Sequence, residues 1–97
     1  MADTYRDYAI GHLEDAADLI GEDADSHVVA SHLSASALCL RPEEFGKRAF
    51  NSLIVDYGHI FDMALGGDPE GAISDIEIMI RRLAKRRKAG GGRGIRT

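Results

Sequence analysis

Apolar residues recur at helical spacing along the chain, and no stretch shows the two-residue alternation of a half-buried strand. The first helical segment covers residues 4–20, with Asp3 or Thr4 as its N-cap and Gly21 placed to end it in a left-handed conformation. The second covers residues 26–40, with Asp25 or Ser26 as its cap. No side of this second segment carries a charge, and its faces are apolar or small. Such a helix is typical of the centre of a bundle or of a subunit interface.

Two further helices are predicted in the second half of the chain. One starts at Pro42, a favourable first helical residue, and continues until the Gly66-Gly67 pair stops it. The last opens with Asp68-Pro69-Glu70, where a capping side chain and a fixed φ precede an acid in the first turn. Its apolar stripe ends at Leu83 and Ala84, whereas Ile78 points away from that stripe.

Short connections between the segments favour antiparallel neighbours, so we expect an all-α fold, a compact three- or four-helix bundle. Residues 1–89 form its single helical domain, and residues 90–97, rich in Gly and Arg, form a disordered basic tail. Because alanine and serine are frequent at the expected helix contacts, the core is poor in large side chains, and association would bury further apolar surface. We therefore predict a homo-oligomer with Ile78, Val28 and Leu38 in the interface.

Composition limits the class of protein. The 97 residues carry 16 acids, 12 bases and one cysteine, which excludes an internal disulfide framework and indicates a reducing compartment. The longest stretch free of Asp, Glu, Lys and Arg is residues 26–40, too short and too polar to span a bilayer. The first residues lack the pattern of a secretion signal. These features predict a cytoplasmic protein without a membrane contact.

Charge is segregated along the chain. Residues 1–25 have a net charge of -7, residues 26–68 of -2 and residues 69–97 of +5. A basic run of this density neutralises phosphates in a salt-dependent manner, so it predicts binding to nucleic acid or to an acidic protein. The predicted binding residues are Arg81, Arg82, Lys85, Arg86, Arg87, Lys88, Arg93 and Arg96.

The acidic end supports a different hypothesis. Asp7, Glu14 and Asp18 fall on one side of the first helix, and Asp3 continues that stripe. Such a stripe imitates the phosphates of a nucleic acid, as in small inhibitors of the kind that phages encode. The alternative function is therefore an inhibitor protein whose acidic helix mimics nucleic acid.

Two carboxylate–histidine pairs are spaced three residues apart, His12 with Asp15 and Asp56 with His59. Residues at this spacing share a helix face, so the two pairs are the candidates for a metal site on facing helices. Gly21-Glu22-Asp23, followed by His32-Leu33 and preceded by His12-Leu13, resembles a stretch of the phage dATP/dGTP diphosphohydrolases. That resemblance implies a metal-dependent helical nucleotide hydrolase, but Ala35 stands where that family has a second histidine, and no catalytic role is carried over.

The sequence contains no complete set of catalytic residues in a known arrangement. Cys39 lies in an apolar helix without a base nearby in sequence, the serines lack a Gly-x-Ser-x-Gly turn, and no phosphate-binding loop is present. We therefore expect no catalytic residues, no cofactor and no metal. The sequence favours a small non-enzymatic binding or adaptor protein that uses its basic C-terminal helix and tail.

Overall fold

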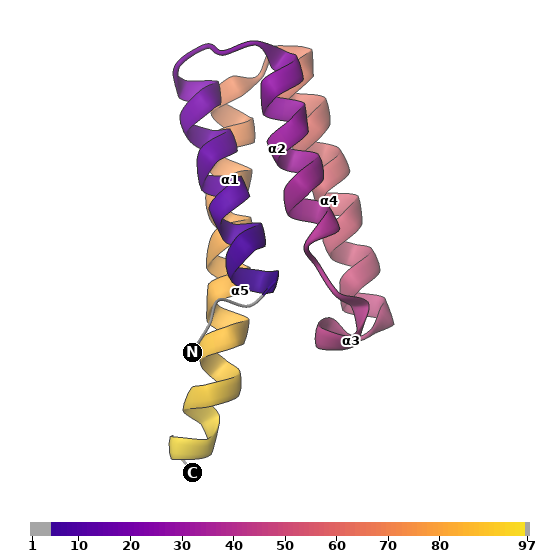
Figure 1. Ribbon diagram of the computed structural model, residues 1–97, viewed down its shortest axis with the longest axis vertical. Helices are drawn as coiled ribbons and strands as arrows, with labels where there is room; N and C mark the ends of the chain where they lie inside the picture. Colours follow the sequence, from indigo (N-terminus) through magenta and orange to yellow (C-terminus); the bar gives the residue numbers. More distant parts are fainter. Residues whose placement is uncertain (1–4, 97) are drawn as a thin grey trace.

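In the computed structural model, four long helices form a bundle in which successive long helices run antiparallel (Figure 1). The structure describes the backbone of residues 5–96 and the side chains of residues 5–84. The long helices are α1 (Tyr5–Gly21), α2 (Ser26–Leu38), α4 (Lys47–Gly66) and α5 (Pro69–Arg96), and a single turn, α3 (Pro42–Phe45), precedes α4. The described residues include no strand, so the predicted all-α bundle is confirmed.

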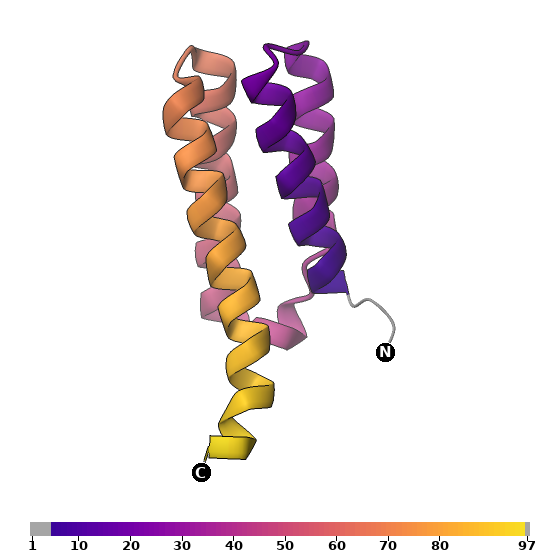
Figure 2. The same cartoon turned by 90° about the vertical axis from the view of Figure 1, so that its left-hand side faces the viewer.

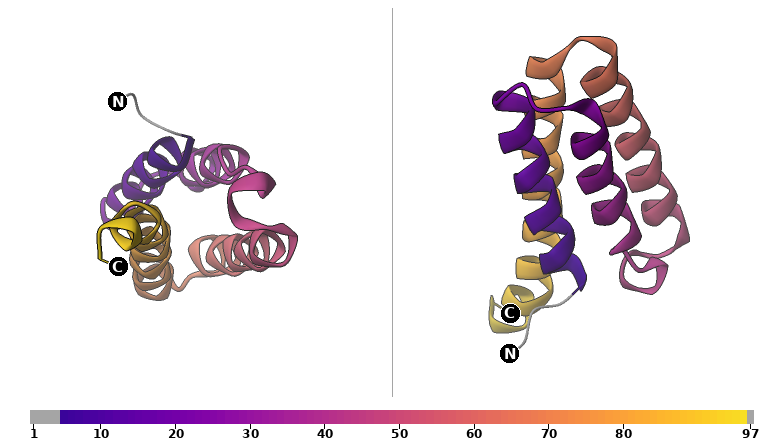
Figure 3. Two further views of the ribbon diagram at one scale, coloured as in Figure 1. Left: turned by 90° about the horizontal axis from the view of Figure 1, so that it is seen from below. Right: turned by 45° about the horizontal axis from the view of Figure 1, so that its top comes forward.

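The long helices surround a common core. Helix α1 packs against α2 and α5, while α4 packs against α5 and, less extensively, α2, which closes the ring seen along the bundle axis (Figure 3). The large side chains with less than 2% exposure include Leu13 of α1, Leu33 of α2, Ile60 of α4 and Leu83 of α5. Leu83 lies at the end of the apolar stripe predicted for the last helix. The other three each lie three or four residues from another buried apolar residue of the same helix, namely Ala9, Val29 and Tyr57. Helical spacing therefore marks the inward face of all four long helices.

The connection between α1 and α2 differs from the prediction in one detail. Gly21 was expected to adopt the left-handed conformation, but the residue with positive φ in this connection is Asp23, at φ 59°. Aspartate tolerates this region because its short polar side chain bonds locally. The helix then restarts where expected, since the Asp25 side chain accepts a hydrogen bond of 2.9 Å from the His27 amide.

The helix predicted to start at Pro42 is divided in two. Gly46 separates α3 from α4 with φ 87° and ψ 153°, a backbone conformation that residues with a Cβ rarely adopt. The expectation of one continuous helix was wrong here because a single glycine turns the chain between two helical stretches. The second helix ends at Leu38, before the predicted residue 40. The boundary between the last two helices lies where predicted: Gly67 caps α4 at φ 96°, and the Asp68 carboxylate accepts the Gly71 amide at the start of α5.

A buried hydrogen-bond chain joins three helices at the centre of the bundle. The Ser36 hydroxyl of α2 donates to the Ala9 carbonyl of α1 at 2.7 Å and lies 2.6 Å from the Tyr57 hydroxyl of α4. Since the serine proton is used toward Ala9, the Tyr57 hydroxyl donates to Ser36. Burial raises the pKa of Tyr57 to about 12, although the bond to Ser36 acts in the opposite direction. The phenol is therefore neutral, and the hydroxyl protons of both Ser36 and Tyr57 have an acceptor.

Beneath the bundle, α3 is held against the start of α1. The Arg6 guanidinium lies 5.3 Å from the centre of the Phe45 ring and 3.8 Å from the Glu44 carboxylate. Arg41, just before α3, stacks on Tyr5 at 3.8 Å from the ring centre. Cation–π contacts of this kind stabilise by about 0.5–2 kcal/mol each, so these contacts fix α3 across the open end of the bundle.

None of the described helices combines the length and the apolar character needed to cross a bilayer.

Candidate functional site

The basic stretch predicted to bind a partner lies on the last half of α5. This helix continues past α3 and beyond the lower end of the bundle (Figures 1 and 2). Among the described side chains of α5, which end at Ala84, Leu83 is the last in the core, at 1% exposure. The backbone of α5 is described as far as Arg96. The disordered tail predicted for residues 90–97 stays a prediction.

Only two of the eight predicted binding residues have described side chains. Arg81 is exposed, and Arg82 donates to the Asp56 carboxylate of α4. Both members of this ion pair are partly exposed, so it adds little stability. The other six lie outside the described side chains, and their role stays a prediction; they are Lys85, Arg86, Arg87, Lys88, Arg93 and Arg96.

The acidic face predicted for α1 is described for three of its four residues, because Asp3 lies outside the described part of the chain. Glu14 and Asp18 are exposed on the same side of the helix, as predicted. Asp7 is half-buried and already engaged in an interaction within the chain. The role of this face as an imitation of nucleic acid stays a prediction.

The three residues predicted for an oligomer interface are all exposed in the single chain. The exposed fractions are 43% for Ile78, 42% for Val28 and 79% for Leu38. Other large apolar side chains are exposed as well, among them Val55 and Leu65 of α4. Exposure of this kind is compatible with association but does not by itself distinguish an interface from ordinary surface.

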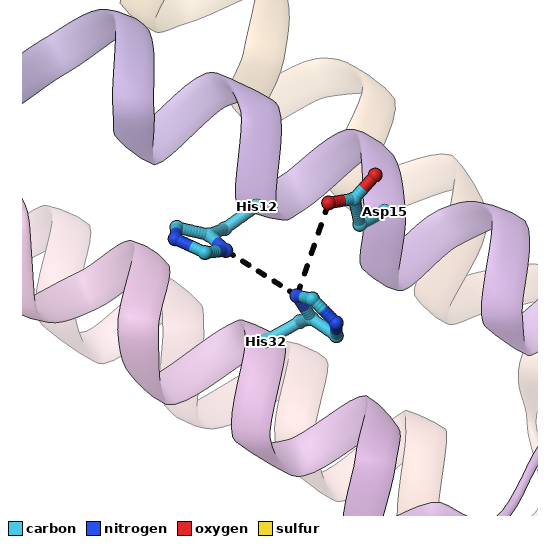
Figure 4. A group of neighbouring side chains, drawn as sticks. All are labelled: His12, Asp15 and His32. Atoms are coloured by element: carbon cyan, nitrogen blue, oxygen red, sulfur yellow. Dashed lines mark hydrogen bonds and ion pairs between the residues drawn. The ribbon is translucent and has the colours of Figure 1, made fainter.

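A second cluster of polar side chains lies between α1 and α2. His12 and Asp15 project from one face of α1 toward His32 of α2 (Figure 4). The two Nδ1 atoms of the histidines are 3.3 Å apart, and Nδ1 of His32 lies 4.0 Å from Oδ2 of Asp15. One ligand atom from each residue falls within 4.8 Å of the others. We call these three residues the histidine–aspartate cluster.

The four candidate metal ligands are therefore not brought together as a set. The structure keeps His12 with Asp15, but Asp56 and His59 line a groove of about 230 Å³ on α4 and α5, where Asp56 pairs with Arg82. His32 takes their place beside His12. This partner was recognisable in principle, because His12 and His32 stand ten residues on either side of Glu22, at the turn of an antiparallel hairpin.

Comparison with known proteins adds no assignment. No family model, no curated protein and no solved structure matches this chain.

Proposed function

We propose that this protein is a non-enzymatic binding protein that uses the basic end of α5 to contact an anionic partner, foremost the phosphate backbone of a nucleic acid. The observation that carries the proposal is the length of α5. The helix spans 28 residues, whereas its antiparallel neighbour α4 spans 20. Because α5 is longer than its neighbour α4, we expect its C-terminal end to contact a partner.

Charge supports the same proposal. Residues 85–96 contain six bases and no acids, while the chain as a whole has a net charge of -4. A local excess of positive charge on an acidic protein directs an anionic ligand to one end of the molecule. Binding to phosphates through such a stretch releases counterions and depends steeply on salt, with little dependence on base sequence.

We further propose that the protein self-associates through exposed apolar side chains of the bundle. Ile78 on α5 and Leu38 at the end of α2 would be covered by a second copy of the chain. Two copies would present two basic helices, and linked binding sites raise the overall affinity without any new contact.

The experiment compares the full chain with a chain truncated after Lys85, each titrated against fluorescent duplex DNA at low salt. The truncation removes five positive charges. We expect binding by the full chain and a loss of at least about tenfold on truncation, since each phosphate contact contributes to the observed affinity. Equal affinity of the two chains would refute the proposal. Binding to polyglutamate with equal strength would assign an acidic protein as the partner instead.

A further inference from the structure

We infer that the histidine–aspartate cluster, His12, Asp15 and His32, is a binding site for a divalent transition-metal ion of the zinc type. The sequence favoured no metal at all, because it offered only pairs of candidate ligands. The bundle supplies the third ligand by packing α2 against α1. This inference does not depend on the role proposed for α5, since the cluster belongs to α1 and α2.

The spacing of the two imidazoles fits a shared ion. Zinc binds imidazole nitrogen at about 2.0–2.1 Å, so two nitrogens of a tetrahedral site are about 3.3 Å apart. The Nδ1 atoms of His12 and His32 are 3.3 Å apart, and their rings are tilted by 41°. With the ring protons on Nε2, both histidines would direct a lone pair at the same point.

Asp15 completes the protein ligands. Its Oδ2 is 4.0 Å from Nδ1 of His32, about 0.6 Å more than a tetrahedral nitrogen–oxygen separation built from the usual bond lengths. The Asp15 side chain is 60% exposed, so a small rotation closes this distance without disturbing the core. His32 is 31% exposed, and a water molecule can reach the fourth coordination position from the same side.

The scaffold and its charge favour a metal over a simple hydrogen bond between the rings. His12 and Asp15 are held at the same helix face, and the neighbouring Leu13 and Leu33 are fully buried, which fixes the two helices at this level. The exposed acids Glu14 and Asp18 lie beside the cluster on α1 and attract cations. Two imidazoles with one carboxylate suit zinc, cobalt, nickel or copper, whereas magnesium and calcium prefer oxygen ligands alone.

The test is isothermal titration of the full, chelator-treated chain with zinc, repeated with cobalt and magnesium. We expect one zinc per chain, the visible absorption bands of tetrahedral cobalt, and no uptake of magnesium. His12→Ala and His32→Ala should each weaken zinc binding by more than about tenfold, and Asp15→Asn by about tenfold, since even loss of a residue that only orients a ligand costs 10–100-fold.

Two matched controls separate the cluster from its surroundings. His27→Ala removes an exposed histidine from the same helix as His32, and Asp62→Asn removes an exposed acid from α4, a helix that does not pack against α1. Both should bind zinc as the unmodified chain does, and circular dichroism of each variant without metal establishes that it is folded. Zinc should also raise the melting temperature of the unmodified chain but not of His32→Ala. No saturable zinc uptake, or uptake that survives in both His12→Ala and His32→Ala, would overturn the inference.

Discussion

Removing the hydroxyl of Tyr57 tests whether the buried hydrogen-bond chain stabilises the bundle. Tyr57 is 2% exposed and Ser36 is fully buried, so neither hydroxyl has access to bulk water. Tyr57→Phe deletes the donor to Ser36 but leaves the serine bonded to the Ala9 carbonyl. We expect a loss of about 1–1.5 kcal/mol in the free energy of unfolding, the usual net value of one hydrogen bond.

Ser36→Ala should cost more than Tyr57→Phe. It leaves the Tyr57 hydroxyl buried without an acceptor and removes the bond to Ala9, so the expected loss is about 2–3 kcal/mol. The double variant no longer contains an orphaned hydroxyl. Its loss should therefore fall short of the sum of the single losses by about 1 kcal/mol.

Urea denaturation followed by circular dichroism measures all three variants against the unmodified chain. A domain of this size has a total stability of about 5–15 kcal/mol, so differences of this size are resolved. Losses that add within about 0.3–0.5 kcal/mol would show that the two residues act independently. That result would refute the hydrogen-bond chain as the source of their contribution.

Four further outcomes are expected. Because burial raises the pKa of Tyr57 from 10.0 to about 12, its contribution to stability is present below pH 10 and is lost as pH rises to about 12, by up to about 2–3 kcal/mol; denaturation midpoints that fall equally in the unmodified chain and Tyr57→Phe would contradict this. Gly46→Ala should cost about 1–3 kcal/mol through backbone strain at φ 87°, whereas the control Gly58→Ala, inside α4, should stabilise by up to about 1 kcal/mol in the same urea titration. Ile78→Lys should weaken self-association by about 1.5–3 kcal/mol per side chain. Light scattering measures this, with Val55→Lys as the control, and an unmodified chain that is monomeric would refute the predicted interface. Truncation after Lys85 should change the unfolding free energy by less than about 0.5 kcal/mol; a melting temperature lowered by many degrees would show that the end of α5 belongs to the fold.

The sequence predicted most of the fold because helical periodicity and capping are local signals. Asp25, Gly67 and Asp68 cap helices as their residue types predicted, and the apolar residues at helical spacing form the core. The break at Gly46 was missed, since a lone glycine inside an apolar helical pattern does not reveal its φ.

The candidate metal site was predictable only in part. The His12–Asp15 pair is a local feature of one helix, three residues apart, and the sequence identified it. Its third member depends on the register between α1 and α2, which is set by packing and by the turn at Asp23. The buried Ser36–Tyr57 bond was missed for the same reason, because the two residues belong to different helices and meet only across the core.

The most direct test of the proposed binding function is the dependence of DNA affinity on salt in two variants that lose the same charge. Arg86→Gln/Arg87→Gln removes two bases of the C-terminal half of α5, and Lys47→Gln/Arg48→Gln removes two exposed bases at the start of α4. If the end of α5 contacts phosphates, the first variant should lower the slope of log affinity against log salt by about 1.8, at about 0.9 per contact, and the second should leave it unchanged. Equal slopes for the unmodified chain and Arg86→Gln/Arg87→Gln, or a larger effect at Lys47 and Arg48, would contradict the proposal that α5 carries the binding surface.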